Sequence, residues 1–174
     1  MNLLKDIAPG VENEINVIIE IPKGSKNKYE IDKETGIIAL DRVHYTTQDT
    51  PFDYGFVPQT LWDDGDALDV IVLTSSPLAT GILVRVRPVA IMDMIDSGEG
   101  DAKIIAVPVS DPRWEEVQDL DDVNKHTLKE MEHYFTTYKN LQNKEVVING
   151  FKGKAEAIEA FHKAVKLFKA QNNK

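Results

Sequence analysis

The feature that most constrains the fold of this chain is a succession of short apolar runs that are separated by turns and not by helices. Each run is rich in Val and Ile and is bounded by Gly, Pro or Asp, as β-strands are. Strands without intervening helices favour an antiparallel sheet or a small barrel. The runs are EINVIIEIP, KYEID, GIIALDRV, DYGFVP, LDVIVLTS, ILVRVRPVAIM and KIIAVPV.

The hydrophobic period changes in the last third of the chain. From Val123 onward, apolar residues recur at intervals of three and four, which is the spacing of an amphipathic helix. One stripe is Leu128, Met131, Phe135 and Tyr138, and a second is Ile158, Phe161, Val165 and Phe168. The sequence therefore predicts an α+β, mainly β fold with two amphipathic helices in its C-terminal half. Because 42% of the 174 residues are hydrophobic, residues 1–174 are expected to form a single domain.

The charge balance narrows the class of partner. The sum of Lys and Arg is 20 and that of Asp and Glu is 29, so the net charge is −9. This charge disfavours a nucleic acid or an anionic membrane as partner. It is compatible with a phosphate substrate, because divalent cations can lie between a polyanion and protein carboxylates.

Residues that are absent from the sequence exclude further classes. No apolar run reaches the roughly 20 residues of a membrane-spanning helix, and the start MNLLKDIAPG lacks the apolar core of a signal peptide, so a cytoplasmic protein is expected. The lack of cysteine excludes disulfides, thiolate ligands and a cysteine nucleophile. His126 and His133 do not have the spacing of a zinc-protease motif and are interpreted as surface or packing residues.

The stretch Asp63–Val70, DDGDALDV, gathers carboxylates just before an apolar run. Their repulsion must be relieved by protonation, by a cation or by exposure to water. An EF-hand calcium loop that starts at Asp64 fails, because Asp69 falls where glycine is needed and Ser75 where glutamate is needed. A phosphoaspartate motif also fits poorly, because Leu68 stands where Thr or Val is expected. Taken alone, the stretch is typical of a solvated acidic loop.

A second acidic stretch, DMIDSGEGDAK, indicates that the first is not isolated. It places Asp93, Asp96, Glu99 and Asp101 in a short segment with two glycines, which we expect to be a loop, before Lys103 and another apolar run. Two acidic loops that converge at one end of a barrel would bind hard divalent cations through oxygen ligands. The alternative is two unrelated turns, because Asp and Gly are ordinary turn residues.

Cationic and phenolic residues complete a candidate site for a charged phosphate. Each has an ordinary alternative as a solvated strand end, a core residue or part of a helix stripe, and their joint occurrence carries the prediction. They are Lys28, Arg42, Tyr54, Tyr138 and Lys139.

Together these segments resemble the family I soluble inorganic pyrophosphatases in their short prokaryotic form. DGDALDV matches the Asp-x-Asp-x-x-Asp signature of that family, and the likeness covers nearly the whole chain in the family's order. The matching segments are IEIPKGSKNKYEID, LDRV, DYGFVP, RPVAIMDMIDSGEGDAK, IIAVP and HYFTTYKNL.

The resemblance implies a fold, a reaction and a set of site residues. The fold is a five-stranded OB-like barrel with the helices packed outside, and the reaction is Mg²⁺-dependent hydrolysis of pyrophosphate to two phosphates by a homohexamer. Asp66 matches the general base, and Glu20 matches a further acidic site position. The implied metal ligands are Asp64, Asp69, Asp96, Asp101 and Glu30, and the implied substrate-binding residues are Lys28, Arg42, Tyr54, Lys103, Tyr138 and Lys139.

Three residues depart from the family pattern. Ala67 stands where proline is usual, Thr50 where several relatives have an aromatic residue, and Ser97 where some have glutamate. None of them removes an implied ligand.

Two rival functions fit the sequence less well. A nucleic-acid-binding barrel is disfavoured, because such modules present basic grooves with aromatic residues for stacking, whereas this chain is acidic. A metal-dependent phosphatase of organic phosphates is the second rival, and the chain shows no long insertion suited to gripping a nucleoside or a sugar.

Overall fold

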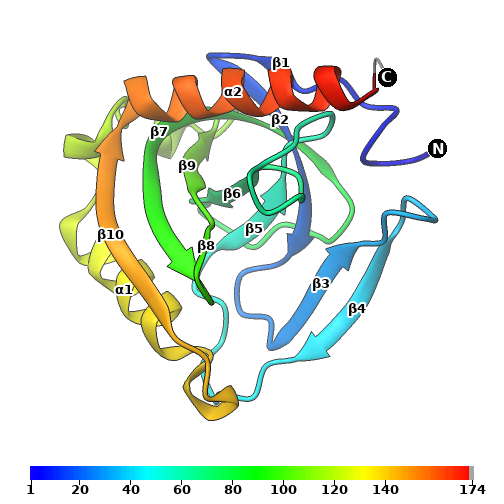
Figure 1. Cartoon of the computed structure of the whole chain (residues 1–174). Helices are drawn as coiled ribbons and strands as arrows, with labels where there is room; N and C mark the ends of the chain where they lie inside the picture. Colours follow the sequence, from blue (N-terminus) through cyan, green and yellow to red (C-terminus); the bar gives the residue numbers. More distant parts are fainter. Residues whose placement is uncertain (173–174) are drawn as a thin grey trace.

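The main sheet curls into a closed ring of five strands (Figure 1). A computed structural model describes residues 1–172 of the chain. Around the ring β2 pairs with β5, β5 with β6, β6 with β9, β9 with β7, and β7 again with β2. All of these pairs are antiparallel except β6 with β9, which is parallel. The ring strands are β2 (Glu14–Ile21), β5 (Asp53–Phe56), β6 (Asp69–Val72), β7 (Leu83–Asp96) and β9 (Lys103–Pro108).

Three further strands extend the ring at its margins. The short strand β1 (Gly10–Val11) pairs with β2, and β8 (Glu99–Gly100) pairs with the end of β7. The longer β10 (Val146–Gly153) pairs antiparallel with the second half of β7. Strand β7 thus belongs both to the ring and to an outer layer, which explains its length.

The ring strands are apolar because they are buried on both faces. Nearly all of β2 and every residue of β9 is buried, so their sequences read as continuous apolar runs and do not alternate. Where β2 crosses β5, a Cβ atom on Gly55 would lie 2.0 Å from the carbonyl oxygen of Ile18. Only glycine therefore fits at this crossing.

Two helices cover the ring from outside, as Figure 1 shows. Helix α1 (Lys125–Thr137) begins at Asn124, whose side chain accepts hydrogen bonds from the backbone nitrogens of His126 and Thr127. Helix α2 (Lys154–Asn172) follows β10 directly and lies across one end of the ring. Short 3₁₀ helices complete the chain: η1 (Pro112–Trp114), η2 (Leu120–Asp122) and η3 (Asn140–Gln142).

A separate two-stranded sheet stands beside the ring. It is the hairpin of β3 (Asn27–Ile31) and β4 (Ile38–Val43), and Figure 1 shows it on the side away from α1. None of the residues in its two strands is fully buried. The hairpin therefore has no core of its own and depends on anchors to the ring.

The predicted mainly β fold with a five-strand ring and two outer helices is confirmed, with three corrections. Each predicted run contains a strand, but β10 was not predicted, because its sequence VVINGFKG lacks a sustained apolar pattern. Strand β7 runs on to Asp96, so Asp93 and Asp96 lie on a strand and not in a loop.

The third correction concerns the buried face of α2. The predicted stripe contains Phe161, but the other fully buried residues of the helix are alanines: Ala157, Ala160 and Ala164. Small side chains let the helix axis approach the sheet closely, so these alanines contact the core while Ile158 and Phe168 are only half-buried. None of the helices in residues 1–172 is long and apolar enough to cross a membrane.

Candidate active site

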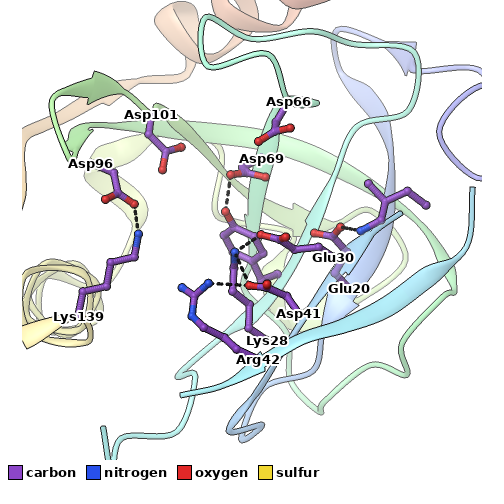
Figure 2. Close-up of polar contacts among 12 residues, drawn as sticks. Glu20, Lys28, Glu30, Asp41, Arg42, Asp66, Asp69, Asp96, Asp101 and Lys139 are labelled. Atoms are coloured by element: carbon purple, nitrogen blue, oxygen red, sulfur yellow. Dashed lines mark hydrogen bonds and ion pairs between the residues drawn. The ribbon is translucent and has the colours of Figure 1, made fainter. Parts of the chain in front are cut away.

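One cavity of about 820 Å³ lies where the ring, the hairpin and the end of α1 meet. It is lined by every site residue predicted from the sequence except Arg42. Figure 2 shows side chains from all three regions pointing into the same space. The two acidic stretches thus converge, as the sequence predicted.

The first acidic stretch forms a tight loop before β6. The backbone nitrogen of Trp62 donates to the carbonyl oxygen of Asp66 at 2.7 Å, and Gly65 takes a φ of +84°, which a residue with a side chain rarely adopts. The backbone nitrogen of Asp66 donates to Oδ1 of Asp64 at 2.9 Å. The loop therefore holds Asp64 by one oxygen, while the side chain of Asp66 is 59% exposed and pairs with Lys33.

A buried ammonium group organises the centre of the site. Nζ of Lys103 lies 2.8 Å from Oδ2 of Asp69, 2.7 Å from Oδ1 of Asp101 and 2.8 Å from the phenol oxygen of Tyr54. The phenol of Tyr54 also donates to Asp69. Asp69 and Lys103 meet because they are register partners on the parallel strands β6 and β9.

The charge of Lys103 is secured by its neighbours. Burial by itself lowers the pKa of this lysine, but the carboxylates of Asp69 and Asp101 outweigh it and raise the pKa above its usual value. The lysine therefore stays protonated and orients the two carboxylates from one side.

The second acidic stretch contributes Asp96 and Asp101. Asp96, at the end of β7, pairs with Lys139, which follows the end of α1 (Figure 2). The turn between these acids uses a left-handed residue, Ser97, with a φ of +53°. Asp93 does not join the other acids of this stretch. It lies outside the cavity, and its Oδ2 is 3.4 Å from Nζ of Lys152.

The hairpin provides the opposite wall. Lys28 and Arg42 are cross-strand neighbours on β3 and β4, and both contact Asp41. The guanidinium of Arg42 lies 2.6 Å from Asp41 and does not line the cavity, whereas Lys28 does, paired with Glu30. Figure 2 shows these four side chains as one linked group.

Glu20 connects the ring to the hairpin. This carboxylate, 5% exposed on β2, accepts a hydrogen bond of 2.7 Å from the backbone nitrogen of Ile31 at the end of β3. Burial, and then the nearby charge of Asp69, raise the pKa of Glu20 well above its ordinary value. Glu20 thus carries a negative charge poorly, unless a cation is near.

The cavity fits hard divalent cations by its chemistry. Its donors are carboxylate oxygens, and burial followed by the charges of Asp101 and Asp66 raises the pKa of Asp64. Among residues 1–172, Lys103 and Tyr54 engage only Oδ2 of Asp69 and Oδ1 of Asp101, which leaves the second oxygen of each carboxylate available.

The carboxylates do not converge on one point as they stand. Within residues 1–172, no three acidic or histidine side chains lie close enough together to hold a metal ion. Three lysines, Lys33, Lys103 and Lys139, each pair with a carboxylate of the cavity. A cation would compete with these ammonium groups for the same oxygens.

Sequence reasoning missed several residues that line the cavity. Asp41 and Lys33 could have been found from their place beside Arg42 and near Glu30 in the hairpin, and Glu99 was noted only as part of the acidic stretch. His44 gave no signal, because its partners lie far away in the sequence. The other cavity residue of note is Thr50, which is buried and lies 3.3 Å from the phenol oxygen of Tyr134.

Known proteins resemble this chain over most of its length. A model of the family described as inorganic pyrophosphatase matches residues 17–169. An inorganic pyrophosphatase of Leifsonia xyli subsp. xyli is 53% identical over 143 residues, which are 82% of this chain and 88% of the relative. That of Haloferax volcanii is 44% identical over 171 residues, 97% of each chain.

A solved structure extends the likeness to three dimensions. The crystal structure of inorganic pyrophosphatase from Thermus thermophilus superposes with a TM-score of 0.93 at 40% identity, covering 97% of this chain and 99% of that one. The chain therefore belongs to the inorganic pyrophosphatase family, the metal-dependent enzymes that hydrolyse pyrophosphate to phosphate.

Proposed function

We propose that this pyrophosphatase uses Mg²⁺ and that the cavity of about 820 Å³ is its active site. The observation that carries the proposal is the gathering of carboxylates and ammonium groups around one cavity. Carboxylates lie at the end of the ring beside Lys103, and the hairpin and the end of α1 add Lys28 and Lys139, each paired with a carboxylate. This is the arrangement that a substrate with several negative charges needs when cations accompany it.

The proposed roles follow from position. Asp64, Asp69, Asp96 and Asp101 would hold Mg²⁺ at the ring end, and Glu30 would reach a metal from the hairpin. Lys28, Arg42, Tyr54, Lys103, Tyr138 and Lys139 would bind phosphate oxygens or orient the carboxylates. For Arg42 this requires the guanidinium to turn from Asp41 into the cavity when a phosphate is bound.

Asp66 is the proposed general base. Its side chain is exposed in the acidic loop and lines the cavity, and it pairs with the exposed Lys33, so a water in the cavity can reach its carboxylate. In the proposed reaction, a water oxygen attacks one phosphorus and the bond to the bridging oxygen breaks. The water proton passes to the carboxylate of Asp66, and the cationic groups offset charge on the leaving phosphate.

Bound Mg²⁺ would lower the pKa of water and neutralise the charge on the phosphate oxygens. The chain's own part is to orient the carboxylates. Glu20, through Ile31, would set the position of the hairpin relative to the ring.

Phosphate release tests the metal and the substrate together. We expect release from pyrophosphate with Mg²⁺, and little from ATP or a phosphomonoester. Calcium should inhibit, because it prefers more ligands at longer and more flexible distances than octahedral Mg²⁺. Undiminished release after exhaustive chelation, or full turnover with calcium, would contradict the metal assignment.

We also propose an oligomeric state and a cellular location for the enzyme. Residues 1–174 would act as one pyrophosphatase domain in the cytoplasm, and the resemblance to the short prokaryotic form supports a homohexamer. Light scattering that gives the mass of one chain, or fractionation that places the enzyme outside the cytoplasm, would remove these parts.

A further inference from the structure

His44 is a cavity residue that no role above uses. It follows β4 and lies two residues after Arg42. Its backbone nitrogen donates to the carbonyl oxygen of Lys26 at 2.8 Å, which closes the base of the hairpin. Its side chain leaves the hairpin and contacts α1, where Nδ1 lies 3.2 Å from the phenol oxygen of Tyr134.

The contact continues into a stack of rings. The centroid of the imidazole is 6.2 Å from that of Tyr134 and 6.1 Å from that of Tyr138. The two tyrosines stack on each other with centroids 5.2 Å apart and planes at 25°. His44 therefore contacts Tyr138, the proposed phosphate ligand at the end of α1, in two ways: directly, and through Tyr134, which stacks on Tyr138.

One nitrogen of His44 is buried and unpaired. Nε2 has no hydrogen-bond partner among residues 1–172, although its surface is covered. A buried polar atom of this kind costs stability, and an apolar residue of similar size would avoid the cost. This favours a role for the other nitrogen, Nδ1, which lies within hydrogen-bond distance of the Tyr134 phenol.

The imidazole acts by its shape and its hydrogen bond and not by its charge. Burial, and then the charges of Arg42 and Lys28, lower the pKa of His44. The imidazole is therefore neutral near pH 7 and adds no positive charge to the hairpin.

We propose that His44 is a positioning residue that couples the hairpin to the end of α1. Through Tyr134 and Tyr138 it sets the separation between Arg42 on one side and Tyr138 and Lys139 on the other. The two sets of groups can then hold one pyrophosphate together. This inference rests on the proposed assignment of Arg42 and Tyr138 to phosphate.

Gln48 provides a matched control at the same contact between α1 and the segment that follows β4. Nε2 of Gln48 donates to Oγ1 of Thr137 at 2.9 Å, so Gln48 also joins the segment after β4 to α1. Neither Gln48 nor Thr137 lines the cavity. If these contacts only stabilised the fold, loss of the His44 contact and loss of the Gln48 contact would change KM alike.

The experiment measures KM and kcat for pyrophosphate at saturating Mg²⁺. For His44→Leu we expect KM to rise roughly five- to tenfold, the scale of one neutral hydrogen bond, with kcat within about twofold, because binding is lost equally in ground and transition state. His44→Asn keeps a polar atom near the place of Nδ1 and should return KM to within about twofold of wild type. Gln48→Ala should leave KM unchanged.

Tyr134→Phe removes the partner hydroxyl by itself and provides the test if His44→Leu does not fold. It should raise KM at least as much as His44→Leu, because it also removes the contact with Thr50. The double variant should be no worse than Tyr134→Phe, because both changes remove the hydrogen bond between His44 and Tyr134. An unchanged KM in the foldable variants, an equal rise in Gln48→Ala, or additive effects in the double variant would overturn the inference.

The Arg42→Met variant distinguishes a failure of the proposed His44 role from a failure of the proposed phosphate-binding role of Arg42. A higher KM in Arg42→Met with a normal KM in His44→Leu would refute the role of His44 alone. A normal KM in Arg42→Met would remove the assignment of Arg42 to phosphate and with it the inference about His44, whereas the Mg²⁺ assignment is decided by the phosphate-release assay.

Discussion

The ring and the hairpin supply opposite walls of one cavity, and they are built in opposite ways. On the ring, the carboxylates lie beside buried strands, and the central Lys103 side chain is only 4% exposed. On the hairpin, none of the strand residues is fully buried, and the side chain of Glu30 is 51% exposed. The ring is held by its core, whereas the hairpin is held by a few polar contacts.

The difference suggests a division of labour. Metal ligands need fixed geometry, and all the proposed ligands except Glu30 lie on or near ring strands, whose register is set by ring closure. A wall that binds a substrate and releases two products benefits from weaker anchoring, because segments with few buried contacts open most readily. Glu20 and His44 are two of the points at which the hairpin is tied to the ring and to α1. Substitutions on the ring and on the hairpin should therefore differ in their effects on activity.

The largest effect is expected at Asp69, on the ring. Asp69→Asn removes a proposed metal ligand and leaves Lys103 with Asp101 alone. Activity should fall by roughly 10³-fold at low Mg²⁺, the scale of several kcal/mol of charge stabilisation. It should recover in part as Mg²⁺ is raised, which a titration of rate against Mg²⁺ would show. Asp93→Asn, a carboxylate of β7 outside the cavity, is the control and should behave as wild type.

Asp66, in the exposed acidic loop, should give a smaller loss of a different kind. Asp66→Asn keeps the size of the side chain and removes its basicity, so turnover should fall by roughly 10²-fold. The Mg²⁺ concentration that gives half the maximal rate should change little. If added Mg²⁺ restored the rate, Asp66 would be a metal ligand and not the base.

On the hairpin, substrate affinity should suffer more than turnover. Arg42→Lys keeps the charge and loses the planar fork that matches phosphate, so KM for pyrophosphate should rise by roughly tenfold, the value of about 1.4 kcal/mol. Steady-state kinetics measure it. Lys26→Met at the base of the hairpin is the control, because Lys26 is exposed and pairs only distantly with Asp49, at 3.7 Å. A larger loss of kcat than of affinity would mean that the hairpin takes part in the chemistry.

The smallest effect is a pH dependence of stability at the joint between hairpin and α1. The pKa of His44 is lowered in the folded chain by burial and by Arg42 and Lys28, and the other groups facing it are Tyr134 and Tyr138. The unfolded chain therefore binds more protons near the ordinary histidine pKa of about 6.5. Stability present above that pH is lost as pH falls through the pKa of the folded state.

The measurement compares thermal unfolding of wild type and His44→Asn at pH 7 and pH 5 with a chelator present. Between these two conditions, wild type should lose roughly 1–3 °C more in Tm than the variant; the difference is small because the half-buried imidazole is partly screened by solvent. Equal losses in both proteins would show that His44 does not titrate abnormally.

Local pattern was enough to predict most elements. Runs of Val and Ile located the ring strands, and three-four spacing located both helices, because these signals act between neighbours in the sequence. The pattern failed at β10, where apolar residues are sparse, and on α2, where the alanines make the close contact. In both cases the deciding partner is strand β7, which is distant in sequence from both elements.

The sequence by itself determined which chemistry the chain carries: two acidic stretches, each followed by a strand, with cationic residues in the early hairpin and after the first helix. Tertiary structure decided which of these groups meet. Asp69 and Lys103 touch only because β6 and β9 pair in parallel with one register, and Asp93 is excluded because it lies on β7 and contacts Lys152 outside the cavity. His44 reaches Tyr134 across 90 residues. Side-chain types and spacings are local properties, whereas register and closure depend on the free energy of the whole packed ring.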